Sequence, residues 1–176
     1  VNGVEVDRTR MGTGTVSYTT RADAAPTYAA ASASLSEVFV PASALTTGDN
    51  VIAVETHVNY LRTPTVSMQA SIVRVEGTPD GNSSIPSDHN TESDDATKPI
   101  NAATVKSGTV IDTGAEWNYW TSTNEPSSDW ATTGSLASWN RGSGPIGWGD
   151  SCAATALDIA KKDRAVTYYF ARDIDL

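Results

Sequence analysis

The chain has 176 residues, a formal net charge of −9 and a single cysteine, Cys152. That length allows one domain with a sizeable core or two small ones, and one cysteine excludes a disulfide framework within the chain. The acidic balance argues against nucleic acid as a partner, because no basic stripe is present to displace the counterions of a phosphate backbone. No apolar run has the length of a membrane span, so we expect no membrane insertion and a soluble extracellular or cell-surface protein.

The first predicted element is a hairpin whose turn lies at the very start of the chain. The dipeptide Asn2-Gly3 is a strong signal for a type I′ turn, because both central residues of that turn need positive φ. Val4 and Val6 then alternate with acidic residues, which predicts a half-buried strand. The sequence has no initiator Met and no signal peptide, and we therefore expect it to be a piece of something larger.

Short elements joined by turns are predicted next. Residues 13–21 have an extended pattern, and the Ala- and Ser-rich residues 22–36 predict a loop with a helical turn. Residues 37–40 (EVFV) predict a strand that Pro41 ends. Residues 41–50 (PASALTTGDN) predict a short helical turn followed by a Gly-Asp-Asn turn.

The clearest strand pattern covers residues 50–60, NVIAVETHVNY. Alternate positions carry mixed side chains on one side and a more apolar set on the other, which we expect to face the core: Ile52, Val54, Thr56, Val58 and Tyr60. Residues 65–76 (TVSMQASIVRVE) predict another strand by the same alternation. Residues 77–98 are polar and acidic, and we expect a flexible linker because nothing in them offsets the entropy of ordering.

All five tryptophans lie in residues 111–150, among Gly, Ser, Thr, Asn and Pro. With almost no aliphatic residue available, the indoles must supply the buried surface of this segment. We predict a short strand from Trp117 to Trp120, and a loop whose Trp130 and Trp139 plug one end of a β-sandwich. The glycines of GSGPIGWGD are expected to form tight turns. Residues 154–159 predict a short strand, residues 160–164 a turn, and residues 166–176 the last strand.

Residues 1–76 contain the pattern VNGVEV…VFVPASALTTGDNVIAVETHV…VSMQASIV. This pattern resembles the back half of a galactose-binding-like jelly-roll module of large secreted bacterial proteins. Residues 99–176 resemble the front half in a second set: Trp117, Tyr119, Trp139, Gly142, Pro145, Gly147, Gly149, Asp150, Tyr169, Phe170 and Arg172. The resemblance implies an all-β jelly-roll β-sandwich, either circularly permuted or made of two half-modules joined by the acidic linker.

Each half alone would be a few strands with an open edge, which is marginal in water. The halves must therefore close on each other within one chain, or complete domains with neighbouring copies or flanking repeats, head to tail. The resembled module has one more strand between YYFARDIDL and VNG. We therefore expect a non-catalytic structural or interaction module, a repeat unit able to assemble into a fibre by strand complementation.

Catalytic and metal sites find little support in the sequence. The two histidines are His57, on a predicted strand beside Glu55, and His89, in the predicted linker. A polar outer sheet face explains His57 better than a catalytic base does, so no catalytic residue and no cofactor are predicted. Zinc would need more His or Cys ligands, whereas a structural calcium near Asp112 and Glu116 is an open alternative to solvated turn carboxylates.

The competing hypothesis is a carbohydrate-binding module accessory to an extracellular hydrolase or phosphoesterase. Sugar faces stack on exposed aromatic rings, and the resemblance implies that Trp117 and Trp139 pack in the core. Trp120, Trp130 and Trp148 are therefore the candidate ligand-binding residues. In the resembled modules position 120 is usually aliphatic and position 148 usually Tyr, so these side chains can equally be core substitutions.

Overall fold

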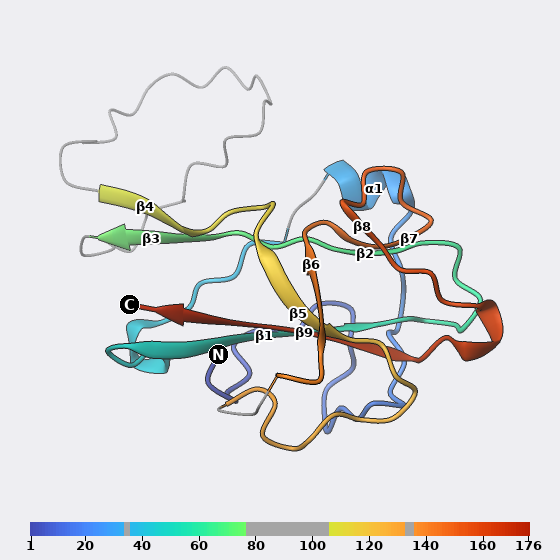
Figure 1. Ribbon diagram of the computed structural model, residues 1–176, viewed down its shortest axis with the longest axis horizontal. Helices are drawn as coiled ribbons and strands as arrows, with labels where there is room; N and C mark the ends of the chain where they lie inside the picture. The colour runs from blue at the N-terminus through green and yellow to red at the C-terminus, as the bar shows by residue number, and fades with distance from the viewer. Residues whose placement is uncertain (34–35, 77–105, 133–135) are drawn as a thin grey trace. The chain divides into compact units, whose positions relative to one another are not determined.

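The computed structural model describes residues 1–33, 36–76, 106–132 and 136–176, and within them the chain is all-β with almost no helix. The helical elements are α1 (Tyr28–Ala33) and two 3₁₀ turns, η1 (Ala42–Ala44) and η2 (Lys161–Asp163). The strands are β1 (Asp49–His57), β2 (Val66–Met68), β3 (Ile72–Glu76), β4 (Lys106–Ile111), β5 (Glu116–Trp120), β6 (Asn140–Ser143), β7 (Ile146–Trp148), β8 (Thr155–Ala156) and β9 (Thr167–Asp175). Figure 1 shows their course along the chain.

The described residues form two compact units. The smaller unit, Ser71–Asp112, holds β3 and β4, which pair antiparallel with an irregularity after Ile72. The larger unit combines Val1–Ala70 with Thr113–Leu176 and contains a four-stranded sheet in the order β1-β9-β5-β6 and a three-stranded sheet in the order β2-β7-β8. Each of these two sheets therefore takes strands from both ends of the chain.

The ladder between β1 and β9 joins the two sequence halves. It runs antiparallel over nine residue pairs, from Asp49 opposite Asp175 to His57 opposite Thr167. At one end Gly48 and Leu176 exchange two backbone hydrogen bonds, and beyond the other end the Val58 N–H donates to the Val166 carbonyl. Strands from residues 1–70 and 113–176 thus share one sheet.

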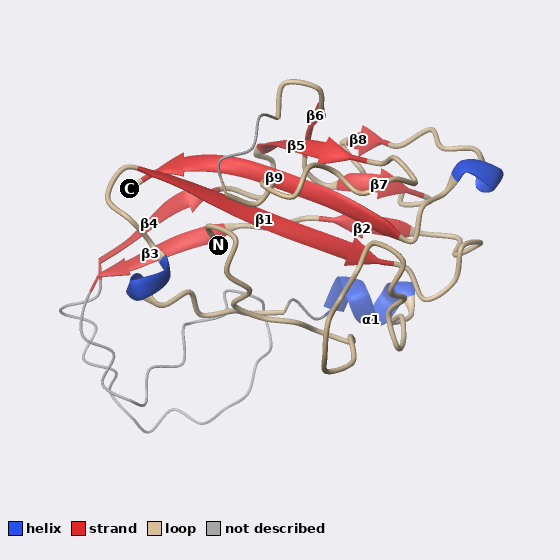
Figure 2. Cartoon of the chain, turned by 90° about the horizontal axis from the view of Figure 1, so that it is seen from below, coloured by secondary structure: helices blue, strands red, loops and turns tan. Residues whose placement is uncertain are grey.

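The central strand β9 is buried on both faces. Tyr168 and Phe170 point to one face and Tyr169 and Ala171 to the other, and all four have an exposed fraction of 1% or less. On the first face the Tyr168 ring meets Trp148 of β7 edge-on, with 4.9 Å between ring centroids. This contact packs the second sheet against the first, and Figure 2 draws the strands of both sheets in red. The opposite face of β9 is covered by aromatic side chains.

Several predicted elements are confirmed, although β1 stops at His57 and β8 covers Thr155–Ala156 alone. They are the strands over residues 50–60, 117–120, 154–159 and 166–176, the helical turn after Pro41 and the turn before the last strand. Ile52 and Val58 are buried, as their alternation predicted, whereas Tyr60 was wrongly assigned to the core: it lies beyond the end of β1 and is 45% exposed. The helical turn expected within residues 22–36 is α1.

Three predictions were wrong. Residues 37–40 form no strand, and Phe39 is 70% exposed. Val4 is 60% exposed on an irregular segment, because no neighbouring strand pairs with it there. The strand predicted over residues 65–76 is split into β2 and β3, which pair with different partners in different sheets.

The linker predicted at residues 77–98 lies outside the described residues, as does His89. None of the helices in the described part of the chain has the length and apolar character that crossing a membrane requires.

Candidate functional site

An aromatic cluster covers the outer face of β9. The rings of Trp130 and Trp139 stack with centroids 5.7 Å apart, and Trp130 meets Tyr169 edge-on at 5.1 Å. Trp120 of β5 lies 6.0 Å from Trp139 in a tilted arrangement. Trp130 and Trp139 are both buried, so the loop between β5 and β6 contributes indoles where an ordinary core has aliphatic side chains.

Trp148 belongs to the interior between the two sheets. Its indole N–H donates to the Thr63 carbonyl at 3.3 Å, and the guanidinium of Arg164 lies 4.5 Å from its ring centroid. Arg164 also donates to the Thr63 carbonyl, at 2.8 Å. The edge contact with Tyr168 takes a further part of the ring, and Trp148 is 7% exposed.

These positions decide which indole faces a ligand can reach. Trp130 and Trp148 have their faces against protein groups, so sugar stacking on either would require the core to open. Trp120 is half-buried and donates its N–H to the Asn124 carbonyl at 2.8 Å. The carbohydrate-binding hypothesis stays a prediction, and of the three candidate residues Trp120 is the one whose ring is partly accessible.

The buried phenol of Tyr169 makes stability depend on alkaline pH. Burial raises the pKa of Tyr169 above its usual value of 10, and the carboxylates of Glu55 and Glu125 add to the shift. The stabilisation is complete below the unfolded pKa and is lost above it, because the unfolded chain then releases a proton that the folded chain retains. We expect the free energy of unfolding to fall above pH ~10, and to fall less steeply in Tyr169→Phe.

Tyr168 provides the comparison at neutral pH, whereas at alkaline pH it should behave like Tyr169 because burial also raises the pKa of its phenol. Its hydroxyl oxygen accepts a hydrogen bond from the Ala165 N–H at 3.0 Å, whereas the Tyr169 hydroxyl has no hydrogen-bond partner among the described residues. At neutral pH, Tyr168→Phe should therefore lose about 1–3 kcal/mol, and Tyr169→Phe should lose nothing. Urea unfolding of both variants at neutral and alkaline pH measures this. Equal losses at neutral pH would contradict the assignment.

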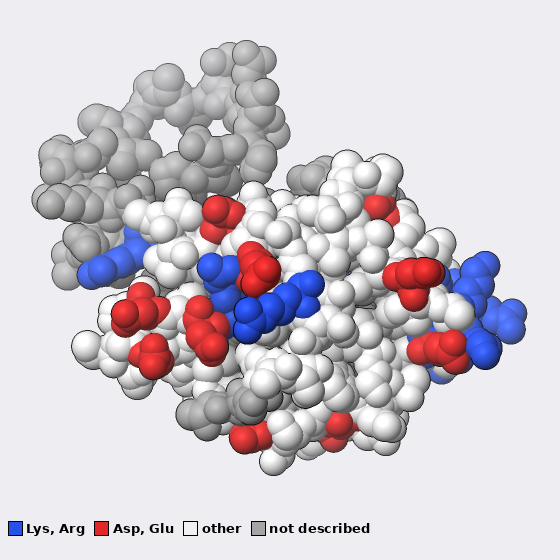
Figure 3. All heavy atoms as spheres, viewed as in Figure 1, with Lys and Arg blue, Asp and Glu red and all other residues white. Residues whose placement is uncertain are grey.

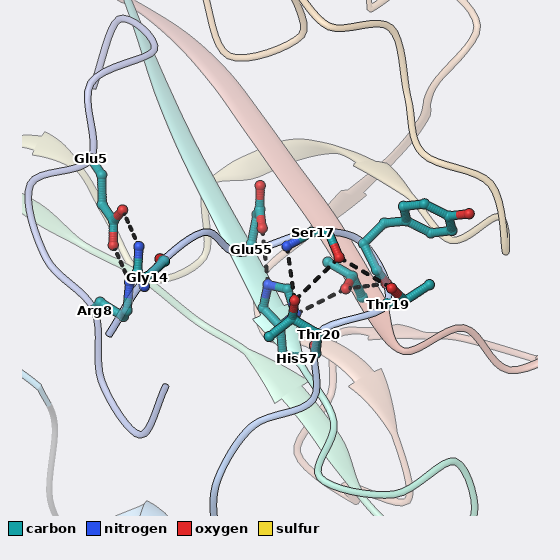
Figure 4. Close-up of polar contacts among 10 residues, drawn as sticks. Glu5, Arg8, Gly14, Ser17, Thr19, Thr20, Glu55 and His57 are labelled. Carbon is teal, nitrogen blue, oxygen red and sulfur yellow. Dashed lines mark hydrogen bonds and ion pairs between the residues drawn. The ribbon is translucent and has the colours of Figure 1, made fainter. Parts of the chain in front are cut away.

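A second candidate site surrounds His57, near the end of β1 (Figure 4). Its Nδ1 lies 2.7 Å from the Thr20 carbonyl oxygen and 2.9 Å from the Thr167 hydroxyl. Its Nε2 lies 2.9 Å from a carboxylate oxygen of Glu55. The Thr167 hydroxyl in turn donates to the Tyr18 carbonyl at 2.8 Å.

The order carboxylate, imidazole, hydroxyl (Glu55, His57, Thr167) resembles a nucleophilic triad, but the hydrogen bonds show a structural role. A catalytic hydroxyl must give its proton to the imidazole, whereas the Thr167 proton points at the Tyr18 carbonyl. Thr167 is also only 1% exposed, so no substrate carbonyl can reach it. His57 and Thr167 therefore fasten residues 18–20 to the sheet. Sequence reasoning missed this role because the two residues are 110 positions apart.

The first of the two carboxylates considered for calcium, Asp112, directly follows β4. Glu116 begins β5 and lies 3.9 Å from the guanidinium of Arg141. Within the described residues, no three or more His, Cys, Asp or Glu side chains gather in a way that could hold a metal ion. A structural calcium near Asp112 and Glu116 stays a prediction.

Charged side chains are interspersed over much of the face seen in Figure 3, with basic residues gathered at the right of the view. Arg62, Lys161 and Lys162 line an open hollow of about 300 Å³, formed by η2 and the turn before β2. These three cations cover a small area and form no continuous stripe.

The outer edge of β1 is a third candidate site. Because residues 48 and 58 bond to β9, the even-numbered residues of β1 direct their backbone groups toward β9 and the odd-numbered ones away from it. At Val51 this outer edge is occupied: the Asn2 N–H donates to the Val51 carbonyl, and the Val51 N–H donates to the Asn2 side-chain oxygen. Past the other end of the strand, the Ala22 N–H donates to the Val58 carbonyl.

Between these two ends, the outward backbone groups of Ala53 and Glu55 meet no hydrogen-bond partner from any described residue. An edge strand with unpaired N–H and C=O groups is a template for another strand. Sequence reasoning foresaw open edges in general but not this one, since the direction of each backbone group follows from the β1–β9 register.

No protein-family model, curated protein or solved structure matches this chain.

Proposed function

We propose that this chain is a non-catalytic structural and interaction module that joins neighbouring copies by adding a strand to the outer edge of β1. The observation that carries the proposal is the unpaired stretch Ala53–Glu55, bounded by the Asn2 contact at one end and the Ala22 contact at the other. Strand addition supplies affinity through main-chain hydrogen bonds and needs no pocket.

The proposal includes a galactose-binding-like jelly roll assembled from a back half and a front half, as the sequence resemblance implies. The shared β1–β9 ladder supports it, because it joins the two resembling segments in one sheet. An extracellular or cell-surface location is part of the same proposal. The contacts of His57 support a non-catalytic role, since both of its ring nitrogens are engaged by protein oxygens.

Replacing Ala53 with proline tests whether the outer edge of β1 is the assembly site. The Ala53 N–H points away from β9, so Ala53→Pro removes an edge donor and leaves the β1–β9 hydrogen bonds in place. We expect the wild-type chain to form multimers of its 18.5 kDa unit as concentration rises, and Ala53→Pro to stay monomeric. Light scattering combined with small-angle X-ray scattering over a dilution series measures both.

Val54→Pro is the matched comparison, since its N–H belongs to the β1–β9 ladder and its loss should unfold the chain. A folded Ala53→Pro variant that still assembles like the wild type would reject the edge of β1 as the assembly site. A wild-type chain that remains a compact monomer at every concentration would reject the proposed function itself.

A further inference from the structure

We propose that the strand added to β1 is β6 of the next copy, so that copies join head to tail through one continuous sheet. This inference rests on the proposed function and names its partner. The strands β1 and β6 are the two edges of the same four-stranded sheet. All three of its internal pairings are antiparallel, so β1 and β6 run in opposite directions.

Because β1 and β6 run in opposite directions, identical copies can be joined edge to edge in the same orientation. A copy shifted across the sheet brings its β1 beside β6 of the first copy in the antiparallel arrangement that the sheet already has. The contact joins two different edges, so it is heterologous and leaves one open edge at each end. Sheet twist then turns each copy relative to the last, and the product is a helical filament.

Backbone directions at β6 fit this role. The Gly144 N–H donates to the Ala115 carbonyl, so Gly142 and Asn140 direct their backbone groups toward β5 and Arg141 and Ser143 direct theirs outward. The Ser143 carbonyl accepts a hydrogen bond from the Thr155 hydroxyl, whereas no described residue bonds to the outward backbone groups of Arg141.

One register stands out because the β1 edge is already occupied at Val51. Placing Arg141 opposite Glu55 puts Ser143 opposite Ala53, and the next position, Val51, is held by Asn2. In this register both outward residues of β6 meet outward residues of β1, and the Ser143 carbonyl would accept a second hydrogen bond beside the one from Thr155 of its own copy. A shift of one further pair toward Val51 would have to displace Asn2.

Side chains support the same register. Residues paired across a sheet lie on the same face, and the pairs run from Ala53 through Ala171 and Asn118 to Arg141. Glu55 lies two residues after Ala53 and is therefore on that face as well. Arg141 and Glu55 would thus lie directly opposite each other on one side of the extended sheet. Their side chains are 67% and 37% exposed, and opposite charges in this position stabilise strand pairing.

Both charged groups already have neighbours within their own copy. Arg141 donates through Nε to the Asn118 side-chain oxygen at 3.2 Å, and one carboxylate oxygen of Glu55 contacts His57. Nη1 of Arg141 also lies 3.9 Å from a carboxylate oxygen of Glu116, so its Nη2 and the second oxygen of Glu55 are the atoms that would meet across the interface. A charge swap can therefore test the pair.

The experiment compares Arg141→Glu, Glu55→Arg and the double variant by sedimentation velocity at low ionic strength. Each single reversal places like charges opposite each other and should weaken association about tenfold or more. The double variant restores opposite charges and should return to within about threefold of the wild type. Asp158→Lys reverses an exposed charge that belongs to neither edge strand and should leave association unchanged.

Circular dichroism spectra and thermal midpoints show whether each variant is folded. Single reversals that assemble like the wild type, or a folded double variant with no recovery, would overturn the β6–β1 pairing. If Ala53→Pro still blocked assembly in that case, strand addition at β1 would stand with a different donor. A wild-type chain that never assembles would overturn both ideas.

Discussion

Gly147→Ala should destabilise the chain by about 3 kcal/mol or more, because a methyl group at this position has no space. An ideal Cβ on Gly147 would lie 1.9 Å from the Val66 carbonyl oxygen and 2.8 Å from the Ser67 Cα. Both atoms belong to the backbone of β2, so relief requires β2 to move away from β7 rather than one side chain to rotate.

The position of Gly147 enlarges the effect. It lies in the middle strand of the three-stranded sheet, opposite Ser67 of β2 on one side and Ala156 of β8 on the other. Its carbonyl also accepts a hydrogen bond from the Leu157 N–H at 2.8 Å. Moving β2 would disturb the setting of Trp148, whose indole bonds to Thr63 just before that strand.

Gly108→Ala is the matched control, since a Cβ there would meet no atom within 4 Å. We expect it to change stability by no more than ~0.5 kcal/mol, as at an ordinary surface position. Urea midpoints at equal m-value measure the difference between the two variants. Similar midpoints for both variants would contradict the prediction, because they would show that β2 can move away from β7 with little loss of stability.

Gly147 also illustrates what sequence patterns can resolve. The glycine-rich run around it predicted tight turns, and Gly149, with φ of 68°, does lie in a bend directly after β7. Gly147 lies within a strand, where the requirement is the close approach of another backbone. Composition alone does not separate these two reasons for glycine, because the approaching strand is about 80 residues away in sequence.

The dependence on distant parts of the chain also explains why some predicted strands are confirmed and others are wrong. The alternation of residues 50–60 was a sound guide along β1, which pairs with the buried strand β9 and has Ile52 buried. It failed at Tyr60, which is 45% exposed beyond the end of the strand. The alternation of Val4 and Val6 looked similar, yet Val4 is 60% exposed because no strand pairs with it. Local periodicity reports an amphipathic pattern, whereas pairing is decided by the rest of the chain.

The candidate sites were predictable in part for a related reason. That the indoles form buried packing followed from the lack of aliphatic residues around them, and Trp117 and Trp139 are buried as the resemblance implied. That Trp130 and Trp148 are equally buried depends on contacts with Tyr169 and Tyr168, which a linear pattern does not contain. The hydrogen bonds of His57 and the open edge of β1 could not be predicted, because both depend on the register between strands more than 100 residues apart.

Trp139→Ala should cost about 3–5 kcal/mol, because Trp139 joins the other two indoles of the outer cluster. It stacks on Trp130 with an interplanar angle of 24° and also contacts Trp120, while Trp130 alone reaches Tyr169 of β9. Few aliphatic side chains surround the cluster, Leu136 and alanines among them, so neighbouring groups can fill little of the cavity. The loss should therefore lie near the upper part of the range for a buried aromatic residue.

Trp120→Ala is the control within the same cluster, since Trp120 is half-buried and its N–H bonds a loop carbonyl. We expect a loss at least about 1 kcal/mol smaller than for Trp139→Ala, because less of its surface leaves water on folding. Tryptophan emission should also shift to longer wavelength in Trp139→Ala, as water reaches the exposed face of Trp130. If Trp120→Ala proved as costly as Trp139→Ala, the loop between β5 and β6 would be held by its outer ring rather than by the stacked pair.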